Sequence, residues 1–543
     1  MTKWIVFLMI LSGGFVTSLA QDVVYQFAVP VASRTAYLWI PPRCEQVRGV
    51  VAAFANLTER MWLDDAMARK AMSDECLAAL WIGPGDESLL NADLKPGNKE
   101  IIEKLFRDLA EVSGFPELAN APVIATGHSA HGQFAWRFAE VEPERTIAAI
   151  PIKTVPLPAN LQIAGIPLLY IVGESTEWPQ YRDGRQGDRE FFWPVVRDSA
   201  RRLRQQNPLN LVAVATDPGG GHFDWNSEDA RLMALFLHKA CALRLPALNG
   251  TRALRPVQVN DGWVVDSAGV DPDRWPPQSL RTFRGESGEA YWAFDDEMAH
   301  AIVNFAGDRH RRHTQMLTVE QDGQLLPVAK QGFAAPRFVP ESDGVTFQLR
   351  PAHLDAVPSE LTGAGLPLGH SKQPVRMYAI TGPVEQVDPY SFRIAMKRAT
   401  ADGDIWIEET QDGDDFYRKA VQPIRLRVPL KLNSGMPQQI HFSPIADLRA
   451  GVHSVRLKAT STSGLPVRFY VDYGPAVVVN GHLDLRDVPL HGCRSIEVRV
   501  VAYQWGSLAE SNPVDAVQNA VPVSRSFHIE TGRSGRAPSF RCR

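Results

Sequence analysis

The sequence of 543 residues predicts a doubly wound α/β domain with a mostly parallel sheet, followed by two β-rich regions. From residue 23 to about 245, short apolar runs alternate with helical patterns, as expected for a sheet that helices cover on both faces. After Leu245-Pro246 the segments alternate apolar and polar residues, and Asp-Gly pairs indicate hairpins. The chain is several times longer than a usual domain, so we expect several domains.

The composition is that of a packed globular protein. Apolar residues make up 45% and charged residues 22% of the chain, which excludes disorder over its whole length. Lys and Arg number 57 against 61 Asp and Glu, for a formal net charge of −4. Because nucleic-acid-binding proteins carry a basic surplus, this balance argues against a nucleic-acid partner.

The first residues predict an export signal. Lys3 supplies the positive end, residues 4–11 form a short apolar core, and Ser18-Leu19-Ala20 is a small-residue cleavage pattern, so residues 1–20 are expected to be removed. The apolar run is short for a membrane anchor, and Ser12-Gly13-Gly14 interrupts it. We therefore expect a periplasmic or extracellular protein without stable membrane insertion after cleavage.

The five cysteines are Cys44, Cys76, Cys241, Cys493 and Cys542, and they are widely dispersed. No pair has the close spacing of a zinc site or a redox motif, so the pattern predicts no metal site. Cys44 and Cys76 could form a disulfide in an oxidising compartment. Buried inert thiols are the alternative, and the sequence leaves both open.

The α/β domain is expected over residues 22–248. Its buried strands are predicted by six apolar runs, and its helices by three segments with apolar residues at helical spacing. The runs are 49–55, 77–82, 121–126, 146–152, 167–172 and 209–214, and the helical segments are 99–112, 196–205 and 227–243.

A β-rich middle domain is expected over residues 250–435, with one short helix at about 294–305. In residues 436–530, turns recur about every 8 to 12 residues, which predicts an immunoglobulin-like β-sandwich. Residues 531–543 are basic and contain Gly and Ser, and they are expected to form a loose tail.

The strongest chemical signal follows the strand that ends at Thr126. There the chain reads Gly127-His128-Ser129-Ala130-His131-Gly132 and continues into a helical segment, 133–141. A serine on a sharp strand-to-helix turn stands above the sheet, and the amide after it faces a developing oxyanion. The segment resembles the nucleophile elbow of the α/β-hydrolase superfamily, Gly-x-Ser-x-Gly, with His131 at the second glycine position and Gly132 one residue later.

The resemblance implies a catalytic acid and then a histidine farther along the chain. After the strand 167–172 the candidates for the acid are Glu177 and Glu174, and Glu177 is preferred because it lies farther into the loop, where it can turn back toward a histidine. After the last strand, a Gly-rich turn presents His222, which would take the Ser129 proton and return it to the leaving group.

The resemblance also implies an oxyanion hole. The backbone N–H of Ala130 is one expected donor, and Leu57 or Asn56, in the loop after the strand at 49–55, would supply the other. A serine mechanism of this kind requires neither a metal nor an organic cofactor.

The match to the superfamily covers about residues 25–245, and the full arrangement resembles secreted bacterial hydrolases with appended β domains, often carbohydrate esterases of the acetyl xylan or feruloyl type. Together with the export signal, this resemblance implies an exported serine esterase for acylated polysaccharide or phenolic esters. A serine peptidase of the same fold is one alternative. A non-catalytic surface or carbohydrate-binding protein with a degenerate hydrolase domain, favoured by His131, and an assembly scaffold are the others. The oligomeric state is not indicated.

Overall fold

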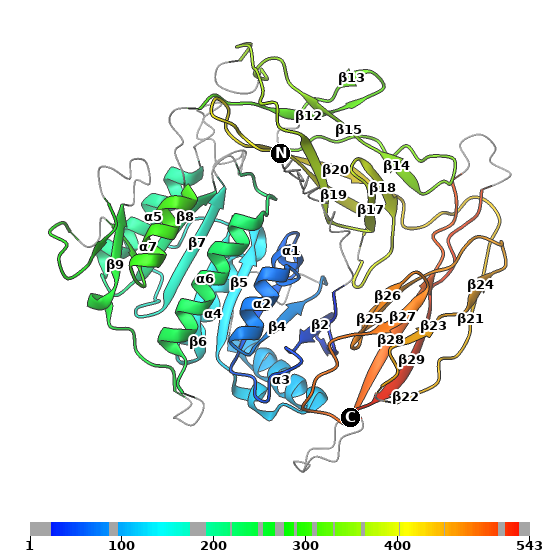
Figure 1. The fold of residues 1–543 in the computed structure, drawn as a ribbon, viewed down its shortest axis with the longest axis horizontal. Helices are drawn as coiled ribbons and strands as arrows, with labels where there is room; N and C mark the ends of the chain where they lie inside the picture. The colour runs from blue at the N-terminus through cyan, green and yellow to red at the C-terminus, as the bar shows by residue number, and fades with distance from the viewer. Residues whose placement is uncertain are drawn as a thin grey trace, which may run out of the picture.

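In the computed structural model the chain forms three parts, an α/β domain, a middle β region and a C-terminal β-sandwich (Figure 1). Side-chain hydrogen bonds join each part to the other two. Arg398 of the middle region joins all three, because its guanidinium donates to the carbonyl of Val23 at 3.2 Å and to that of Val471 in the sandwich at 3.1 Å. The structure describes residues 23–85, 96–173, 192–217, 220–247, 253–266, 276–286, 290–306, 312–328, 332–359, 364–400, 402–449, 451–508 and 516–531.

The α/β domain contains an eight-stranded sheet of order β1-β2-β4-β3-β5-β6-β7-β8. Strands β3 to β8 are parallel to their neighbours, whereas β1 and β2 pair antiparallel with each other and β2 pairs antiparallel with β4. The parallel strands are buried along their whole length, which confirms the predicted α/β class and explains their continuous apolar runs. The strands are β1 (Phe27–Val31), β2 (Arg34–Trp39), β3 (Gly49–Phe54), β4 (Leu77–Ile82), β5 (Val123–His128), β6 (Thr146–Ile152), β7 (Pro167–Gly173) and β8 (Leu211–Asp217).

Helices cover both faces of this sheet. Val51 and Ala53 of β3 face one apolar core, which α2, α5 and α6 share, while Val50 and Ala52 face another, which α3 covers. This alternation follows from the two-residue period of a strand. The helices are α1 (Glu59–Leu63), α2 (Ala66–Asp74), α3 (Pro96–Ser113), α4 (Gln133–Val141), α5 (Phe192–Gln206) and α6 (Ser227–Arg244).

The core of the α/β domain extends past the boundary expected at residue 248. A small antiparallel sheet and a helix follow α6 and pack on the same apolar core, through residues such as Tyr291, Met298 and Ile302. The helix occupies nearly the segment predicted for it. These elements are β9 (Trp263–Asp266), β10 (Gln278–Ser279), β11 (Ala290–Ala293) and α7 (Asp296–Ala306).

The middle region is built of three small antiparallel sheets around one apolar core that includes Phe347, Phe392 and Ile407. Asp322 and Gly323 have φ angles of 54° and 74°, the turn conformation that the Asp-Gly pair predicts between two hairpin strands. The strands are β12 (Leu317–Gln321), β13 (Gln324–Leu325), β14 (Thr346–Gln348), β15 (Arg350–His353), β16 (Val375–Thr381), β17 (Val384–Asp388), β18 (Ser391–Ile394), β19 (Asp404–Gln411) and β20 (Ala420–Arg427).

The C-terminal part contains two main sheets that share a core formed by residues such as Leu483, Val498 and Phe527. One sheet has the order β22-β29-β28-β25 and the other β23-β27-β26, and β21 and β24 form a separate pair. The strands are β21 (Ile440–Phe442), β22 (Leu448–Arg449), β23 (Ser454–Arg456), β24 (Ala459–Ser461), β25 (Arg468–Tyr473), β26 (Ala476–Val479), β27 (His482–Leu485), β28 (Ser495–Tyr503) and β29 (Val523–Glu530).

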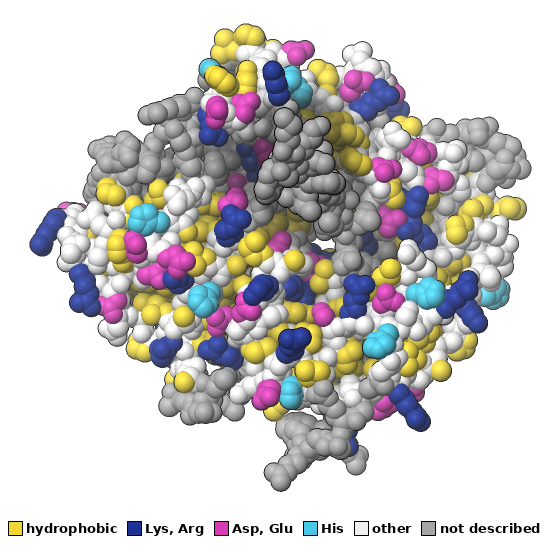
Figure 2. Space-filling model, viewed as in Figure 1, with side chains coloured by type: hydrophobic (Ala, Val, Ile, Leu, Met, Phe, Trp, Pro, Cys, Tyr) yellow, Lys and Arg dark blue, Asp and Glu magenta, His cyan; other side chains and the backbone are white. Residues whose placement is uncertain are grey.

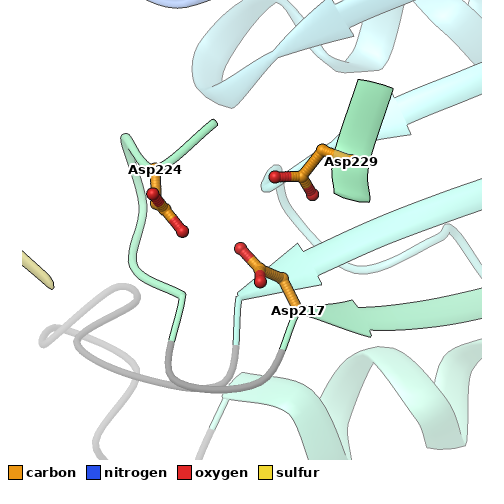
Figure 3. A group of neighbouring side chains, drawn as sticks. All are labelled: Asp217, Asp224 and Asp229. Carbon is orange, nitrogen blue, oxygen red and sulfur yellow. The ribbon is translucent and has the colours of Figure 1, made fainter. Parts of the chain in front are cut away.

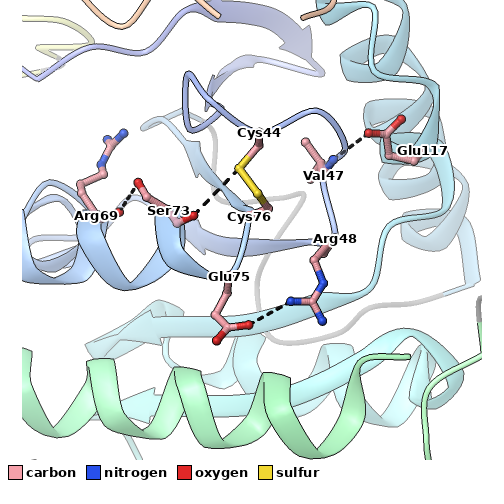
Figure 4. The surroundings of a disulfide bond; sticks show 8 residues. All are labelled: Cys44, Val47, Arg48, Arg69, Ser73, Glu75, Cys76 and Glu117. Atoms are coloured by element: carbon pink, nitrogen blue, oxygen red, sulfur yellow. Dashed lines mark hydrogen bonds and ion pairs between the residues drawn. A yellow bond between two sulfur atoms is a disulfide. The ribbon is translucent and has the colours of Figure 1, made fainter. Parts of the chain in front are cut away.

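A disulfide joins Cys44, in the loop between β2 and β3, to Cys76 at the start of β4 (Figure 4). Of the two alternatives that the sequence leaves open for this pair, the structure shows the bond. Beside it, the guanidinium of Arg48 pairs with the Glu75 carboxylate at 3.0 Å. Cys241 is a buried free thiol.

The visible surface carries acidic and basic side chains in a mixed distribution (Figure 2). Within the described ranges, no helix is both long and apolar enough to cross a membrane. The predicted signal at 1–20 and nearly all of the predicted tail, from residue 532 onward, lie outside the described residues.

Candidate active site

Ser129 lies at the turn between β5 and the helix that follows it. Its φ angle is 55°, in the left-handed region that a residue other than glycine seldom adopts. A Cβ on Gly127 would lie 2.3 Å from the carbonyl oxygen of His131, and a Cβ on Gly132 would lie 2.4 Å from Cβ of Thr154. The two glycines therefore allow the backbone of the turn to pack closely, and Gly132 supplies the close contact on the C-terminal side of the serine.

The side chain of His131 points away from this tight packing. Its Nδ1 lies 2.7 Å from the carbonyl oxygen of Ala55, at the end of β3. The imidazole thus connects the serine turn to the loop after β3. The departure from the Gly-x-Ser-x-Gly pattern is accommodated because His131 makes a contact of its own and Gly132 allows the close approach.

His222 lies beside the serine. Its Nε2 is 2.9 Å from Oγ of Ser129, although 93 positions separate the two residues in the chain. His222 belongs to the loop between β8 and α6, whose described part, residues 220–226, is called the His222 loop below. His128 contacts this loop directly, since its Nε2 lies 2.7 Å from the carbonyl oxygen of His222.

A mostly parallel sheet that presents a serine on a tight turn after one strand, and a histidine after the last, is typical of the α/β-hydrolase fold. The N-terminal domain has the α/β-hydrolase fold. No family model matches the chain, and no curated protein matches it.

Solved structures that resemble this α/β-hydrolase domain are distant in sequence and cover less than half of the chain. One is a poly(3-hydroxybutyrate) depolymerase from Bordetella parapertussis (15% identity, 42% of this chain and 93% of that chain, TM-score 0.29). Others are an S-formylglutathione hydrolase from Agrobacterium tumefaciens (12% identity, 41% and 96%, TM-score 0.28) and a monoglyceride lipase from Saccharomyces cerevisiae (10% identity, 41% and 97%, TM-score 0.27). The function of the chain is therefore inferred from the geometry of its own site.

The electrostatic surroundings keep His222 neutral. Burial and the nearby Lys153 ammonium lower the pKa of His222 to about 3. Burial and the neighbouring His222 also hold the pKa of His128 well below its ordinary value. A neutral imidazole has a free lone pair and can accept a proton, which is the state that a general base requires.

Ser129 is nearly buried, with 6% of its surface exposed, whereas the adjacent Ala130 is exposed. A substrate can therefore approach the serine from the side of Ala130. The Ala130 N–H belongs to the first turn of the following helix, where backbone N–H groups have no partner within the helix. This N–H is thus available to the substrate oxygen that becomes negatively charged when Ser129 attacks.

Glu59 connects the loop after β3 to the serine turn. Its Oε2 accepts the N–H of Asn56 at 2.8 Å, and its Oε1 accepts the N–H of His128 at 3.2 Å. Burial raises the pKa of Glu59 to about 8, while backbone N–H groups, that of Asn56 first and that of Leu57 among the others, oppose the rise. Because Glu59 accepts the N–H of Asn56 and the Leu57 N–H also lies near its carboxyl group, the Ala130 N–H is the best placed of the expected donors for an oxyanion.

Three carboxylates, from Asp217, Asp224 and Asp229, lie close together at the His222 loop, to which Asp224 belongs (Figure 3). One oxygen of each carboxylate lies within 4.8 Å of the corresponding oxygens of the other two, which is close enough for a cation. Ammonium groups provide the positive charge here. Lys153 Nζ lies 3.4 Å from Oδ2 of Asp217, and Lys419 Nζ, from the middle region, pairs with Asp224.

The structure thus brings Ser129, Ala130 and His222 together, with Asn56 and Leu57 in the adjacent loop. Glu177 and Glu174 lie outside the described residues. Five supporting residues are not among the candidates that the sequence predicts, namely Glu59, His128, Lys153, Asp217 and Asp224. Two of these had a visible signal, because Asp217 and Asp224 flank His222 in the sequence.

Proposed function

We propose that the chain is an exported serine hydrolase that cleaves carboxylic esters. The observation that carries this proposal is the 2.9 Å contact between His222 Nε2 and Ser129 Oγ, made by a serine with a φ angle of 55° on a strand-to-helix turn. Export to the periplasm or the exterior rests on the predicted signal at 1–20, and the Cys44–Cys76 disulfide supports it because disulfides persist in oxidising compartments.

In the proposed mechanism Ser129 Oγ attacks the ester carbonyl while His222 takes the hydroxyl proton. The negative charge that develops on the carbonyl oxygen is stabilised by the Ala130 N–H, with the Leu57 N–H as the second expected donor. His222 then returns the proton to the leaving alcohol, and a water molecule repeats the sequence on the acyl-enzyme. No step requires a metal or an organic cofactor.

The acid that orients His222 is assigned to the loop after β7, with Glu177 preferred over Glu174. The partners of Asp217 and Asp224 support an acid from that loop rather than either aspartate. Asp217 lies against Lys153, and Asp224 binds Lys419 and accepts a hydrogen bond from Tyr378 OH at 3.0 Å. Both carboxylates are thus committed to groups other than the imidazole.

The preferred substrates are acylated polysaccharides or phenolic esters, a choice that rests on the family resemblance and on export. A serine peptidase of the same fold would use the same groups on amides. Parallel assays with a short-chain nitrophenyl ester and a peptide nitroanilide separate the two reactions, and the proposal requires the ester to be cleaved faster.

The decisive test measures hydrolysis of a short-chain nitrophenyl ester by wild type, Ser129→Ala and His222→Ala. Loss of either group is expected to lower kcat by about 1,000-fold or more. The exposed residues Ser434 and His453 provide matched controls, so Ser434→Ala and His453→Ala should behave like wild type. The proposal fails if wild type is no faster than Ser129→Ala and does not react with a fluorophosphonate probe.

Carbohydrate binding by the C-terminal sandwich is a second candidate function. A groove of about 610 Å³ runs beside β21 and β24, and its lining combines aromatic rings with basic side chains, namely Phe442, Phe469, His441, Arg456, Lys458 and Arg525. Such a lining suits an acidic sugar polymer, because rings stack on sugar faces and cations pair with carboxylates. A pull-down tests this function. An insoluble xylan that bears glucuronic acid should remove the full-length Ser129→Ala protein from solution, and the added changes Arg456→Ala/Lys458→Ala should abolish this binding.

A further inference from the structure

The His222 loop is held from inside the α/β domain by Lys153. This residue follows β6 directly, and only 1% of its surface is exposed. Its Nζ donates to the carbonyl oxygen of Asp224 at 2.6 Å and lies 3.4 Å from Oδ2 of Asp217. One ammonium thus joins the end of β8 to the residue two positions beyond His222.

The middle region holds the same loop from the opposite side. Lys419, which directly precedes β20, pairs with Oδ2 of Asp224 and lies 3.9 Å from Oδ1 of Asp217. Tyr378 of β16 donates its hydroxyl to Oδ1 of Asp224 at 3.0 Å and lies 3.3 Å from the carbonyl oxygen of Trp225. Both oxygens of Asp224 are therefore bound by residues that lie more than 150 positions farther along the chain.

Apolar contacts accompany these polar ones. The ring centroids of Phe223, next to His222, and of Trp406 on β19 lie 4.5 Å apart. Ile380 of β16 is the third buried residue of this apolar cluster. Leu57, from the loop after β3, packs against the same cluster. The sheet of the middle region thus contacts both the loop that carries the histidine and the loop expected to contribute to the oxyanion hole.

The charges at this interface depend on one another. Burial tends to lower the pKa of Lys419, but Asp217, Asp224 and Asp229 raise it above its ordinary value. Burial likewise disfavours an ionised Asp224, yet Lys419 and Lys153 hold its pKa below the ordinary value. The Lys419–Asp224 pair is therefore ionised because both partners are present, and removing one leaves a buried charge without its partner.

We propose that the middle β region is part of the catalytic centre, and that Lys419 and Tyr378 are positioning residues that fix the His222 loop against Ser129. The inference rests on the proposed serine hydrolase function. A general base must be held in place closely, and a displacement of about 1 Å can reduce a rate about 100-fold. The α/β domain thus depends on the middle β region to hold His222 in a catalytically active position beside Ser129.

The test uses the full-length protein and measures kcat, KM and Tm with a nitrophenyl ester, together with the rate of fluorophosphonate labelling. Tyr378→Phe removes one hydroxyl and keeps the ring, so it should fold. It is expected to lower kcat about threefold to tenfold with KM within about twofold. Lys419→Met should lower kcat by about tenfold or more, and also Tm. The exposed Lys431 of the same region is the matched control, and Lys431→Met should match wild type.

A double variant separates positioning from stability. In Lys419→Met/Asp224→Asn the buried carboxylate is neutral, so Tm is expected to recover toward the wild-type value while kcat stays at least about tenfold low. Recovery of kcat together with Tm would overturn the inference, and so would a wild-type kcat in both Tyr378→Phe and Lys419→Met. An inactive wild type would instead overturn the proposed serine hydrolase function itself.

Discussion

His128 Nε2 lies 2.7 Å from the carbonyl oxygen of His222, so the residue before the nucleophile binds the backbone of the proposed base. Because a carbonyl can only accept, His128 carries its proton on Nε2. Its Nδ1 is buried and has no hydrogen-bond partner among the described residues. The strand that presents Ser129 thus also sets the position of His222.

Replacement of His128 should therefore lower activity without touching either reacting group. His128→Phe keeps a ring of similar size but removes the donor, and we expect kcat to fall about tenfold with little change in KM. His128→Gln, which restores an N–H donor, should recover part of the loss. Steady-state kinetics with a nitrophenyl ester checks this, and a wild-type kcat in His128→Phe would show that the contact is dispensable.

Glu59 should be essential to the geometry of the serine turn. Both of its carboxyl oxygens accept a backbone N–H, from Asn56 and from His128, whereas the amide nitrogen of a glutamine cannot accept one. Glu59→Gln is expected to lower the free energy of unfolding by about 1–3 kcal/mol and kcat/KM by about tenfold. Denaturant unfolding and ester kinetics measure both, with the exposed Glu100→Gln on α3 as the matched control. Equal stability and activity in the two variants would contradict this role.

His131 provides a direct test of the degenerate-domain alternative. If a histidine at the second glycine position impairs the elbow, His131→Gly should increase ester hydrolysis. The structure predicts the opposite, because the variant loses the 2.7 Å contact with the Ala55 carbonyl and gains no space that the turn needs. We expect kcat/KM to fall by about threefold to tenfold, in keeping with one hydrogen bond.

The activity should persist at acidic pH. His222 acts as a base in its neutral form, which dominates above its pKa, and burial with the Lys153 ammonium lowers that pKa to about 3. The rate is therefore retained as pH falls below the ordinary histidine value of about 6.5 and is lost only as pH approaches the lowered pKa. The dependence of kcat/KM on pH, measured where Tm shows the protein folded, checks this, and an acid limb centred near 6.5 would contradict it.

The same shift predicts a loss of stability in acid. Between the folded and unfolded pKa values of His222, the unfolded state binds more protons, so the free energy of unfolding falls as pH decreases from about 6.5. His128, whose pKa is also lowered, acts in the same direction. Thermal unfolding of wild type and His128→Phe between about pH 5 and 7 should show a shallower dependence in the variant.

The disulfide should stabilise the domain without affecting catalysis. Cys44 and Cys76 are 32 positions apart, and closing a loop of that size stabilises a protein by about 3–4 kcal/mol. Cys44→Ala/Cys76→Ala should therefore unfold at lower denaturant while keeping its kcat at a temperature where it is folded. An unchanged unfolding midpoint would show that the bond does not contribute to stability.

The fold of the α/β domain could be predicted well because its signals are local. The apolar runs at 49–55 and 77–82 agree with β3 and β4 to within one residue, and the helical spacing at 227–243 matches α6. The last strand begins at Leu211 rather than at 209 and continues to Asp217. The domain to which segment 253–306 belongs could not be predicted, because the sequence of its short strands does not indicate which apolar core they join.

Strand β19 shows where a sequence pattern is ambiguous. The alternation Ile405-Trp406-Ile407-Glu408 suggests one apolar and one solvent-facing side, yet every one of these residues is buried. Ile405 and Ile407 face the core of the middle region, whereas Trp406 packs on Phe223 of the α/β domain. The same alternation of apolar and polar residues is therefore produced by a strand face exposed to solvent and by a strand face buried against another domain.

The amino-acid sequence by itself determined the order of strands and helices and the presence of a serine turn, because side-chain periodicity and turn chemistry act between residues close in the chain. Tertiary structure decided which groups meet at that turn. The contacts of His222 with Ser129, of Glu59 with His128, and of Lys419 with Asp224 join residues 93, 69 and 195 positions apart. Such contacts depend on how whole sheets pack together, and no local pattern encodes them.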